Sequence, residues 1–263
     1  MARAHGIDVS KWQRYFDASV NPGDIQFIVI RTSYGMMTDE SYTKLLESIQ
    51  PVPLRGAYHY FSSGSPWEMQ AKLYLNLVRD AGIHFHCLDI ESAYNKRSAG
   101  FALAARKWME HVRDATEQPV VLYTNPNIYN TWLAPYGDWM KEWPLWVAQY
   151  YNEPNRDRKP ILPRGVDKWA LWQYSADTPP NRKGKEYGVG SGNIDLNVYN
   201  GTLEELKQWL GLGAPEEPVE EPAEGPQVPV EEPAPVGELD YERLAKELAP
   251  LVAPLVAKQL GQG

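Results

Sequence analysis

The segment Phe85-His86-Cys87-Leu88-Asp89-Ile90-Glu91 is a mostly apolar run that ends in two acidic residues. A short apolar run of this length predicts a buried β-strand. Because the side chains of a strand alternate between its two faces, Asp89 and Glu91 should point to the same side. Two neighbouring carboxyl groups repel when both are ionised, so one of the two pKa values should rise. A protonated acid beside an ionised one is what glycoside hydrolysis requires.

Strand-like and helix-like segments alternate on both sides of this run. The predicted strands are His5–Val9, Phe27–Thr32, Gly56–Phe61, His84–Ile90, Val120–Thr124, Leu145–Tyr150, Ala170–Tyr174 and Ile194–Tyr199. The predicted helices are Tyr42–Gln50, Trp67–Ala81, Phe101–Thr116 and Leu203–Leu210. Eight strands, the early ones alternating with helices, predict an α/β fold: a modified TIM-like (β/α) barrel of parallel strands. Helical signal is weak between the late strands, so we expect an incomplete outer helix ring there.

Acidic residues recur at the strand ends of this predicted barrel. Catalytic residues of such barrels lie at the C-terminal ends of strands. Asp8 lies near the end of the first strand, Asp89 and Glu91 end the fourth, and Asp195 lies in the eighth. The first and last strands of a closed barrel are neighbours, so Asp8 and Asp195 should approach each other. A bare Asp-x-Glu pair is usually a solvated strand end, but four acids on one rim indicate a catalytic site.

The order of several segments resembles the family-25 glycoside hydrolases, the Chalaropsis-type lysozymes. The segments are Gly6-Ile7-Asp8-Val9-Ser10-Lys11-Trp12-Gln13, Phe27 to Gly35, Gly56-Ala57-Tyr58-His59-Tyr60-Phe61, Leu88-Asp89-Ile90-Glu91, Leu122-Tyr123-Thr124-Asn125, Leu145 to Tyr150, Leu171-Trp172-Gln173-Tyr174-Ser175 and Ile194-Asp195-Leu196-Asn197. The resemblance implies cleavage of the β-1,4 bond between N-acetylmuramic acid and N-acetylglucosamine in peptidoglycan. It implies that Glu91 is the catalytic acid and Asp89 its partner, with Asp8 and Asp195 in support.

Two roles for Asp89 stay open. It could attack the anomeric carbon as a nucleophile, which requires carboxyl groups about 5–5.5 Å apart. It could instead orient and stabilise the N-acetyl group of the substrate as that group attacks, which we favour because muramic acid carries one. Either route predicts retention of configuration, with Glu91 acting as general acid and then as general base.

Aromatic rings near strand ends are candidates for a sugar-binding floor, because the C–H faces of sugars pack on rings. The candidates are Tyr58, Tyr60, Tyr123, Trp146 and Trp172. Each could equally belong to the core. Arg31 ends an apolar run and could pair with the acid cluster or with another buried acid. We assign a further set of tryptophans to packing: Trp12, Trp108, Trp132, Trp139 and Trp143.

Composition limits the other classes of function. The chain has one cysteine, Cys87, and no Cys/His cluster with metal-ligand spacing, so we expect no disulfide, metal or cofactor. Residues 1–213 carry 23 basic and 23 acidic side chains, which gives no basic footprint for nucleic acid. No window of about 18 apolar residues is present, so we expect no membrane insertion. The N-terminus also lacks the apolar stretch of a signal peptide.

The composition changes at residue 214. Residues 214–236 contain seven Pro and seven Glu, which predicts a Pro/Glu-rich linker after a catalytic domain of residues 1–213. Residues 237–263 form a short amphipathic segment with a predicted helix at Tyr241–Leu248. Leu244, Leu248, Leu251 and Leu255 have coiled-coil spacing, but Pro250 and Pro254 interrupt it. The segment could form a homo-oligomer, dock on a partner or stay unfolded.

The favoured function is thus a lysozyme acting on the glycan strands of peptidoglycan. A modular chain without a signal peptide is typical of a bacteriophage endolysin, which is made in the host cytoplasm and reaches the bacterial cell wall after holin-type release. One alternative is a substrate-assisted, chitinase-like glycosidase. That signature needs an Asp two residues before Asp89, where this chain has Cys87. The other alternative is a non-catalytic wall-binding protein, which would need none of the four acids.

Overall fold

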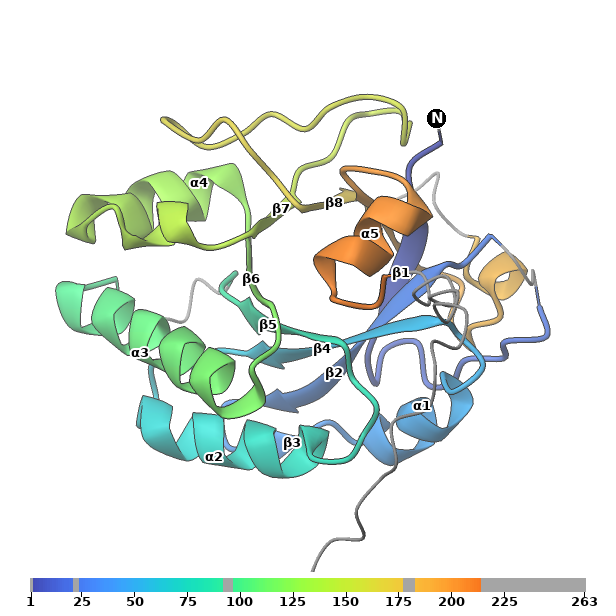
Figure 1. Ribbon diagram of the computed structural model, residues 1–263, viewed down its shortest axis with the longest axis horizontal. Coiled ribbons are helices and arrows are strands. Elements are labelled where there is room, and N and C mark those ends of the chain that lie inside the picture. The colour runs from blue at the N-terminus through green and yellow to red at the C-terminus, as the bar shows by residue number, and fades with distance from the viewer. Residues whose placement is uncertain (1, 21–23, 92–96, 177–182, 214–263) are drawn as a thin grey trace, which may run out of the picture. The chain divides into compact units, whose positions relative to one another are not determined.

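The computed structural model of the protein describes residues 2–20, 24–91, 97–176 and 183–213 (Figure 1). The predictions for the linker 214–236 and the segment 237–263 fall outside the described residues.

Eight strands form a closed barrel in the part of the chain described. They are β1 His5–Val9, β2 Phe27–Tyr34, β4 Leu54–Tyr60, β5 Phe85–Asp89, β6 Val120–Thr124, β7 Leu145–Ala148, β8 Leu171–Ser175 and β9 Asp195–Tyr199. The hydrogen-bonded order is β1-β9-β8-β7-β6-β5-β4-β2, and a pairing between β1 and β2 closes the circle. A ninth strand, β3 Met37–Thr38, forms a short antiparallel pair with the end of β2. The predicted modified TIM-like barrel is confirmed.

One strand does not run in the predicted direction. We expected parallel strands throughout, but β9 is antiparallel to both of its neighbours, β1 and β8. The other strands of the barrel pair in parallel. A parallel β9 would need a crossover that returns the chain to the starting end of the barrel. The described part of the β8–β9 connection contains only one 3₁₀ turn, Gly184–Tyr187, and the chain re-enters at the end where β8 left.

Helices cover only part of the barrel. Figure 1 shows α1 Tyr42–Ser48, α2 Trp67–Val78 and α3 Ala99–Thr116 outside the first half of the strands. After β6 one helical run combines α4 Pro126–Ile128, a π-helical turn at Tyr129–Leu133 and a 3₁₀ turn at Ala134–Tyr136. A further 3₁₀ turn, Trp139–Glu142, precedes β7, and residues 149–170 between β7 and β8 contain no helix. The expected incomplete helix ring is therefore confirmed. No helix among the described residues is long and apolar enough to cross a membrane.

Local sequence explains where the helices begin. Thr202 and Glu205 form a reciprocal capping box at the start of α5 Leu203–Trp209, with each side chain bonded to the other residue's backbone N–H. Ser98 caps α3 by accepting a hydrogen bond from the backbone N–H of Phe101. Pro66 immediately precedes α2, where its lack of a backbone donor costs no helical hydrogen bond.

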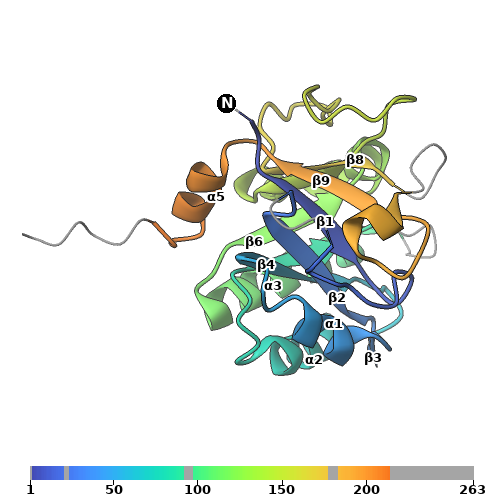
Figure 2. The same cartoon turned by 90° about the vertical axis from the view of Figure 1, so that its right-hand side faces the viewer.

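The core has two layers, because alternate strand residues face opposite sides. Val29, Cys87, Val121 and Leu171 face the inside of the barrel, where they pack in one buried cluster. The other set faces outward against the helices. Leu206 and Leu210, in and directly after α5, belong to the inner cluster, so this helix closes the end of the barrel at which the parallel strands begin. Figure 2 shows α5 at one end of the barrel and β3 at the other.

Candidate active site

The four predicted acids meet at the open end of the barrel. Asp8 of β1, Asp89 of β5, Glu91 and Asp195 of β9 line one cavity of about 250 Å³, here called the acid cavity. Asp8 and Asp195 are register partners across the β1–β9 pair. Asp195 reaches this end because β9 is antiparallel, so its first residue lies beside the ends of the other strands. The sequence analysis expected Asp195 near Asp8 because the first and last strands of a closed barrel are neighbours. That expectation holds, but Asp195 reaches this end through the antiparallel direction of β9, which the sequence analysis did not foresee.

Asp89 and Glu91 differ in their surroundings. Asp89 is 4 % exposed, and no described residue donates a hydrogen bond to its Oδ1 atom. Burial raises the pKa of Asp89 well above its usual value, and the charges of Glu91 and Asp8 raise it further. Glu91 lies just beyond β5 and is exposed to water at the mouth of the cavity, but protein packs around part of its carboxyl group. This burial raises the pKa of Glu91, and Asp8 adds to the effect. The pair therefore holds a proton at a pH where isolated carboxyl groups would both be ionised.

Two amide side chains fix Asp8. Oδ2 of Asp8 accepts hydrogen bonds from Nε2 of Gln173, at 2.8 Å, and from Nδ2 of Asn197, at 2.7 Å. Oδ1 of Asn197 in turn accepts a hydrogen bond from Nε1 of Trp146 at 2.9 Å. Amide donors stabilise a carboxylate without adding charge. Sequence reasoning missed both amides, and the signal for them was their inward register on β8 and β9.

Tyrosine hydroxyls connect this network to Glu91. The hydroxyl of Tyr123 lies 2.9 Å from Oε1 of Gln173 and 3.4 Å from Oε2 of Glu91. The hydroxyl of Tyr150 also donates to Oε1 of Gln173. The predicted residues Tyr58, Tyr123 and Trp146 all line the acid cavity. Trp146 is almost fully buried, at 1 % exposure, so it forms the floor rather than an open platform.

Arg31 pairs with an acid outside the predicted cluster. Its Nε atom donates to Oδ2 of Asp39 at 2.7 Å. The sequence left open a pairing with the acid cluster or with another buried acid, and the structure shows the latter. Arg31 still lines the acid cavity, and its charge opposes the upward shifts in the pKa values of Asp89 and Glu91. The cavity thus contains a fixed positive charge as well as four acids.

A second cavity adjoins the first at its rim. This rim cavity has a volume of about 380 Å³ and shares Trp12, Arg31 and Glu91 with the acid cavity. The predicted residue Tyr60 lines it beside Tyr34, with ring centroids 4.9 Å apart. Our assignment of Trp12 to packing is wrong. The residue is 66 % exposed and lies in the loop directly after β1.

Trp172 is not part of either cavity. It is fully buried, and its Nε1 atom donates to the backbone oxygen of Gln149 at 2.7 Å. Its register partner on β7 is Val147, and both belong to the outer core layer. The neighbouring residue Gln173 faces inward instead. The predicted sugar-binding role of Trp172 therefore fails on strand parity, which puts its side chain on the other face of β8.

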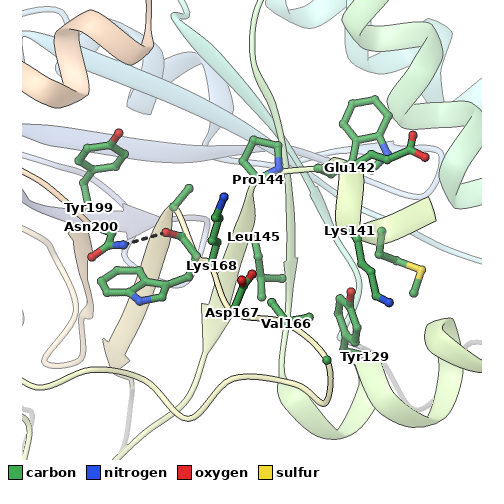
Figure 3. Close-up of a pocket in the computed structure, with 15 residues that line it drawn as sticks. Tyr129, Lys141, Glu142, Pro144, Leu145, Val166, Asp167, Lys168, Tyr199 and Asn200 are labelled. Atoms are coloured by element: carbon green, nitrogen blue, oxygen red, sulfur yellow. Dashed lines mark hydrogen bonds between the residues drawn. The ribbon is translucent and has the colours of Figure 1, made fainter. Parts of the chain in front are cut away.

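Figure 3 shows a larger cavity, of about 540 Å³, at the opposite end of the barrel. It lies where β7 and β8 begin and β9 ends, with Leu145, Ala170 and Asn200 in its lining. Its acids, Glu142 and Asp167, are exposed to water, unlike Asp8 and Asp89. The smaller acid cavity is therefore the candidate active site. Among the described residues no group of three or more His, Cys, Asp or Glu side chains is arranged to hold a metal ion.

The comparison with protein families agrees with this geometry. Residues 7–181 match the family described as glycosyl hydrolases family 25. The chain belongs to glycosyl hydrolase family 25. Three of the four acids lie inside the matched span, whereas Asp195 lies beyond it and joins them through the fold. Family membership makes the protein a glycoside hydrolase, and the acid cavity contains the paired carboxyl groups that this chemistry needs.

Individual relatives support the assignment. The chain is 30 % identical over 217 residues to lysozyme M1 of Streptomyces globisporus, covering 76 % of this chain and 69 % of that protein. It is 32 % identical over 216 residues to the uncharacterized protein YegX of Escherichia coli K12, covering 78 % of this chain and 73 % of YegX. The fold is similar to that of the catalytic domain of endolysin ply40 from bacteriophage P40 of Listeria monocytogenes. That comparison has a TM-score of 0.62 at 24 % identity and covers 80 % of this chain and 98 % of the other.

Proposed function

We propose that the protein is a lysozyme that hydrolyses the β-1,4 bond between N-acetylmuramic acid and N-acetylglucosamine in peptidoglycan. The observation that carries the proposal is the convergence of Asp8, Asp89, Glu91 and Asp195 on one cavity in a family-25 chain. The similarity to lysozyme M1 supports the choice of substrate. Cys87 is buried in the barrel interior below Asp89, so the residue two positions before Asp89 supplies no third acid and the chitinase-like alternative is not favoured.

Glu91 is the proposed general acid and base. It lines both the acid cavity and the rim cavity, so a glycan that spans the two would place a glycosidic oxygen beside its carboxyl group. Its raised pKa keeps a proton available for the departing oxygen. After bond cleavage, the same carboxylate would take a proton from the attacking water, and the product would retain its configuration.

Asp89 is proposed to assist the N-acetyl group of the substrate. Its buried Oδ1 atom has no donor among the described residues, and the N–H of an acetamido group would supply one. This hydrogen bond would orient the acetamido oxygen toward the anomeric carbon.

The two roles of Asp89 can be separated with chemically altered walls. Peptidoglycan whose muramic acid has lost its N-acetyl groups lacks the assisting oxygen, so we expect the cleavage rate to fall to the level of an Asp89→Asn variant. A covalent mechanism would leave cleavage of the deacetylated wall largely intact and would show a glycosyl-enzyme adduct in intact-mass measurements. Either observation would contradict assistance.

The proposed bond is tested by mass spectrometry of the soluble fragments released from purified peptidoglycan. New reducing ends on muramic acid are the expected result. Reducing ends on glucosamine would show that another bond is cut. Binding to the wall without release of fragments would favour the non-catalytic alternative.

The sugar-binding set follows from the two cavities. We propose that Tyr58, Tyr123 and Trp146 surround the sugar at the point of cleavage, since all three line the acid cavity. Tyr60 would contact the neighbouring part of the glycan in the rim cavity. Arg31 lines both cavities and completes the predicted set.

The biological role that we propose is bacterial lysis as a phage endolysin. The similarity of the fold to the endolysin domain from bacteriophage P40 supports this role. Release from the host cytoplasm would then depend on a holin-type pore. The test is expression in a bacterial host with and without a holin: we expect rapid lysis only with the pore. Lysis without it would contradict holin dependence.

Self-association through residues 237–263 stays a prediction. Gel filtration with light scattering of the full chain and of residues 1–213, which contain the whole compact barrel, would test it. A larger assembly is expected only for the full chain. Equal stoichiometry would remove the idea.

A further inference from the structure

Asp39 is a buried carboxylate that joins three parts of the active-site rim. It directly follows β3, and its side chain is completely shielded from water. Its Oδ2 atom accepts hydrogen bonds from Nε of Arg31, at 2.7 Å, and from the backbone N–H of Lys11, at 3.2 Å. Its Oδ1 atom accepts one from the backbone N–H of Ser41 at 2.8 Å. The carboxylate thus ties together β2, the loop after β1 and the start of α1.

These contacts lie where the two cavities meet. Trp12, Arg31 and Glu91 are the residues that line both the acid cavity and the rim cavity. Asp39 holds Arg31 directly through its side chain, and it holds Trp12 through the backbone of the preceding residue, Lys11. One carboxylate therefore anchors two of the three side chains at the junction.

The charge of Arg31 reaches the catalytic pair. Asp39, Asp89 and the hydroxyl of Tyr58 are the titratable groups that face its guanidinium most strongly. Burial raises the pKa values of Asp89 and Glu91, and the positive charge of Arg31 lowers both. Lys11 is a less suitable source of this effect, because its Nζ lies over the Trp12 ring and pairs with the exposed Glu40 at 3.0 Å.

A local irregularity of β2 adds to this arrangement. The register between β2 and β4 shifts between Arg31 and Ser33. After the shift, Ser33 faces outward and bonds to His59, whereas Tyr34 pairs with Tyr60 at the rim. Bulges often redirect side chains beside active sites. Here the bulge directly follows Arg31, so the hydrogen bond to Asp39 secures a side chain at a point where the regular ladder ends.

We propose that Asp39 is a positioning residue of this active site: it holds Arg31 against the catalytic acids and Trp12 at the rim. A single buried side chain thereby sets both the electrostatics of Asp89 and Glu91 and the position of the exposed Trp12 ring, which lines both cavities and which we include as a platform for the glycan. The inference rests on the proposed glycoside hydrolysis at this cavity. Asp39 itself need not touch the substrate.

The test is the pH profile of an Asp39→Asn variant. The substitution keeps the shape of the side chain and removes the charge that holds Arg31. With Arg31 released, the pKa values of Asp89 and Glu91 should rise, because the charge that lowered them is no longer fixed nearby. Both limbs of the kcat/KM profile should therefore move to higher pH by about 1 unit, the lower end of the effect of an adjacent guanidinium. KM should also increase as the Trp12 platform loosens.

A double-mutant cycle shows whether Asp39 acts through Arg31. Arg31→Gln should shift the pH profile in the same direction, and adding Asp39→Asn to it should cause no further shift. The double variant removes both charges together. It therefore still allows the pH profile to be measured if Asp39→Asn alone leaves the buried Arg31 unpaired and does not fold. Asp138→Asn, which breaks the ion pair of Asp138 and Lys141 far from the acids, is the matched control and should keep the wild-type profile.

A direct titration separates this inference from the proposed function. Carbon-13 NMR of the Asp89 and Glu91 carboxyl groups reports their pKa values even if the wild-type protein cleaves no peptidoglycan. If a folded Asp39→Asn variant shows the wild-type titration curves of Asp89 and Glu91 and only a lower melting temperature, Asp39 has a structural role alone and the inference is wrong. Additive shifts in the double variant would show that Asp39 acts independently of Arg31.

Discussion

Asp195, the first residue of β9, lies directly opposite Asp8 in β1, in register across an antiparallel strand pair. Because β9 runs against its neighbours, its beginning rather than its end reaches the open mouth of the barrel. The two strands are far apart in sequence, and their pairing is part of what closes the barrel. The β1–β9 pairing that helps to close the barrel therefore also brings Asp195 into the acid cluster.

Replacing Glu91 by Gln should abolish hydrolysis while leaving the fold intact. The amide has almost the same shape but cannot donate its proton to the glycosidic oxygen, so we expect kcat to fall by about 10²–10⁴-fold or more. Release of fragments from purified peptidoglycan measures the loss, and circular dichroism checks the fold. Glu47→Gln, on the exposed face of α1, is the control with unchanged activity. Lysis at the wild-type rate by Glu91→Gln would refute its role.

Replacing Asp89 by Asn should stabilise the protein at neutral pH. Burial, and then the charges of Glu91 and Asp8, raise the pKa of Asp89 in the folded state. A group of this kind contributes most stability below its unfolded pKa, and that contribution is lost as the pH rises through the folded value. The variant should gain about 1–2 kcal/mol in free energy of unfolding at pH 7 and nothing near pH 3.

Urea unfolding of Asp89→Asn at several pH values measures this gain. The activity should fall at the same time, which is the usual conflict between stability and function at a strained site. Asp114→Asn, at an exposed position in α3, should change stability by no more than about 0.5 kcal/mol. A pH-independent loss of stability in Asp89→Asn would show that the carboxylate is well accommodated in the fold.

Replacing Asn197 by Ala should lower both stability and turnover. Asn197 is fully buried and bonds to both Asp8 and Trp146. Its loss leaves the indole N–H without its acceptor and removes one of two amide donors from Asp8, at a cost of about 1–3 kcal/mol. Thermal unfolding and kcat measure the two effects. Asn127→Ala, at an exposed position of α4, is the control. An Asn197→Ala variant as stable and active as the control would argue against the network.

Trp12 and Trp172 should respond to truncation in opposite ways. Trp12→Ala removes an exposed ring at the junction of the two cavities, so KM should rise with stability nearly unchanged. Trp172→Ala empties a fully buried site and should cost about 3–5 kcal/mol of stability. Kinetics with soluble glycan fragments and urea unfolding separate the effects. An unchanged KM for Trp12→Ala would remove Trp12 from the substrate platform.

Local sequence predicted the elements of this fold well where short-range physics decides them. The apolar run before Asp89 gave a strand with both acids near its end, because side-chain alternation is a property of the strand alone. The last helix begins at Leu203 as expected, because the Thr202 cap that starts it depends on a neighbour only three residues away. The helices α1 and α2 end two or three residues earlier than predicted, since packing of the last turn decides where a helix frays.

The sequence by itself determined the order of the strands, the sparse late helices and the identity of the four acids. Only the tertiary structure decided the direction of β9, the outward face of Trp172, the exposure of Trp12 and the choice of Asp39 as the partner of Arg31. The physical reason is the separation along the chain over which each kind of interaction acts. Propensity and alternation act within a few residues, whereas the facing of a side chain and its polar partners depend on how distant strands pair when the barrel closes.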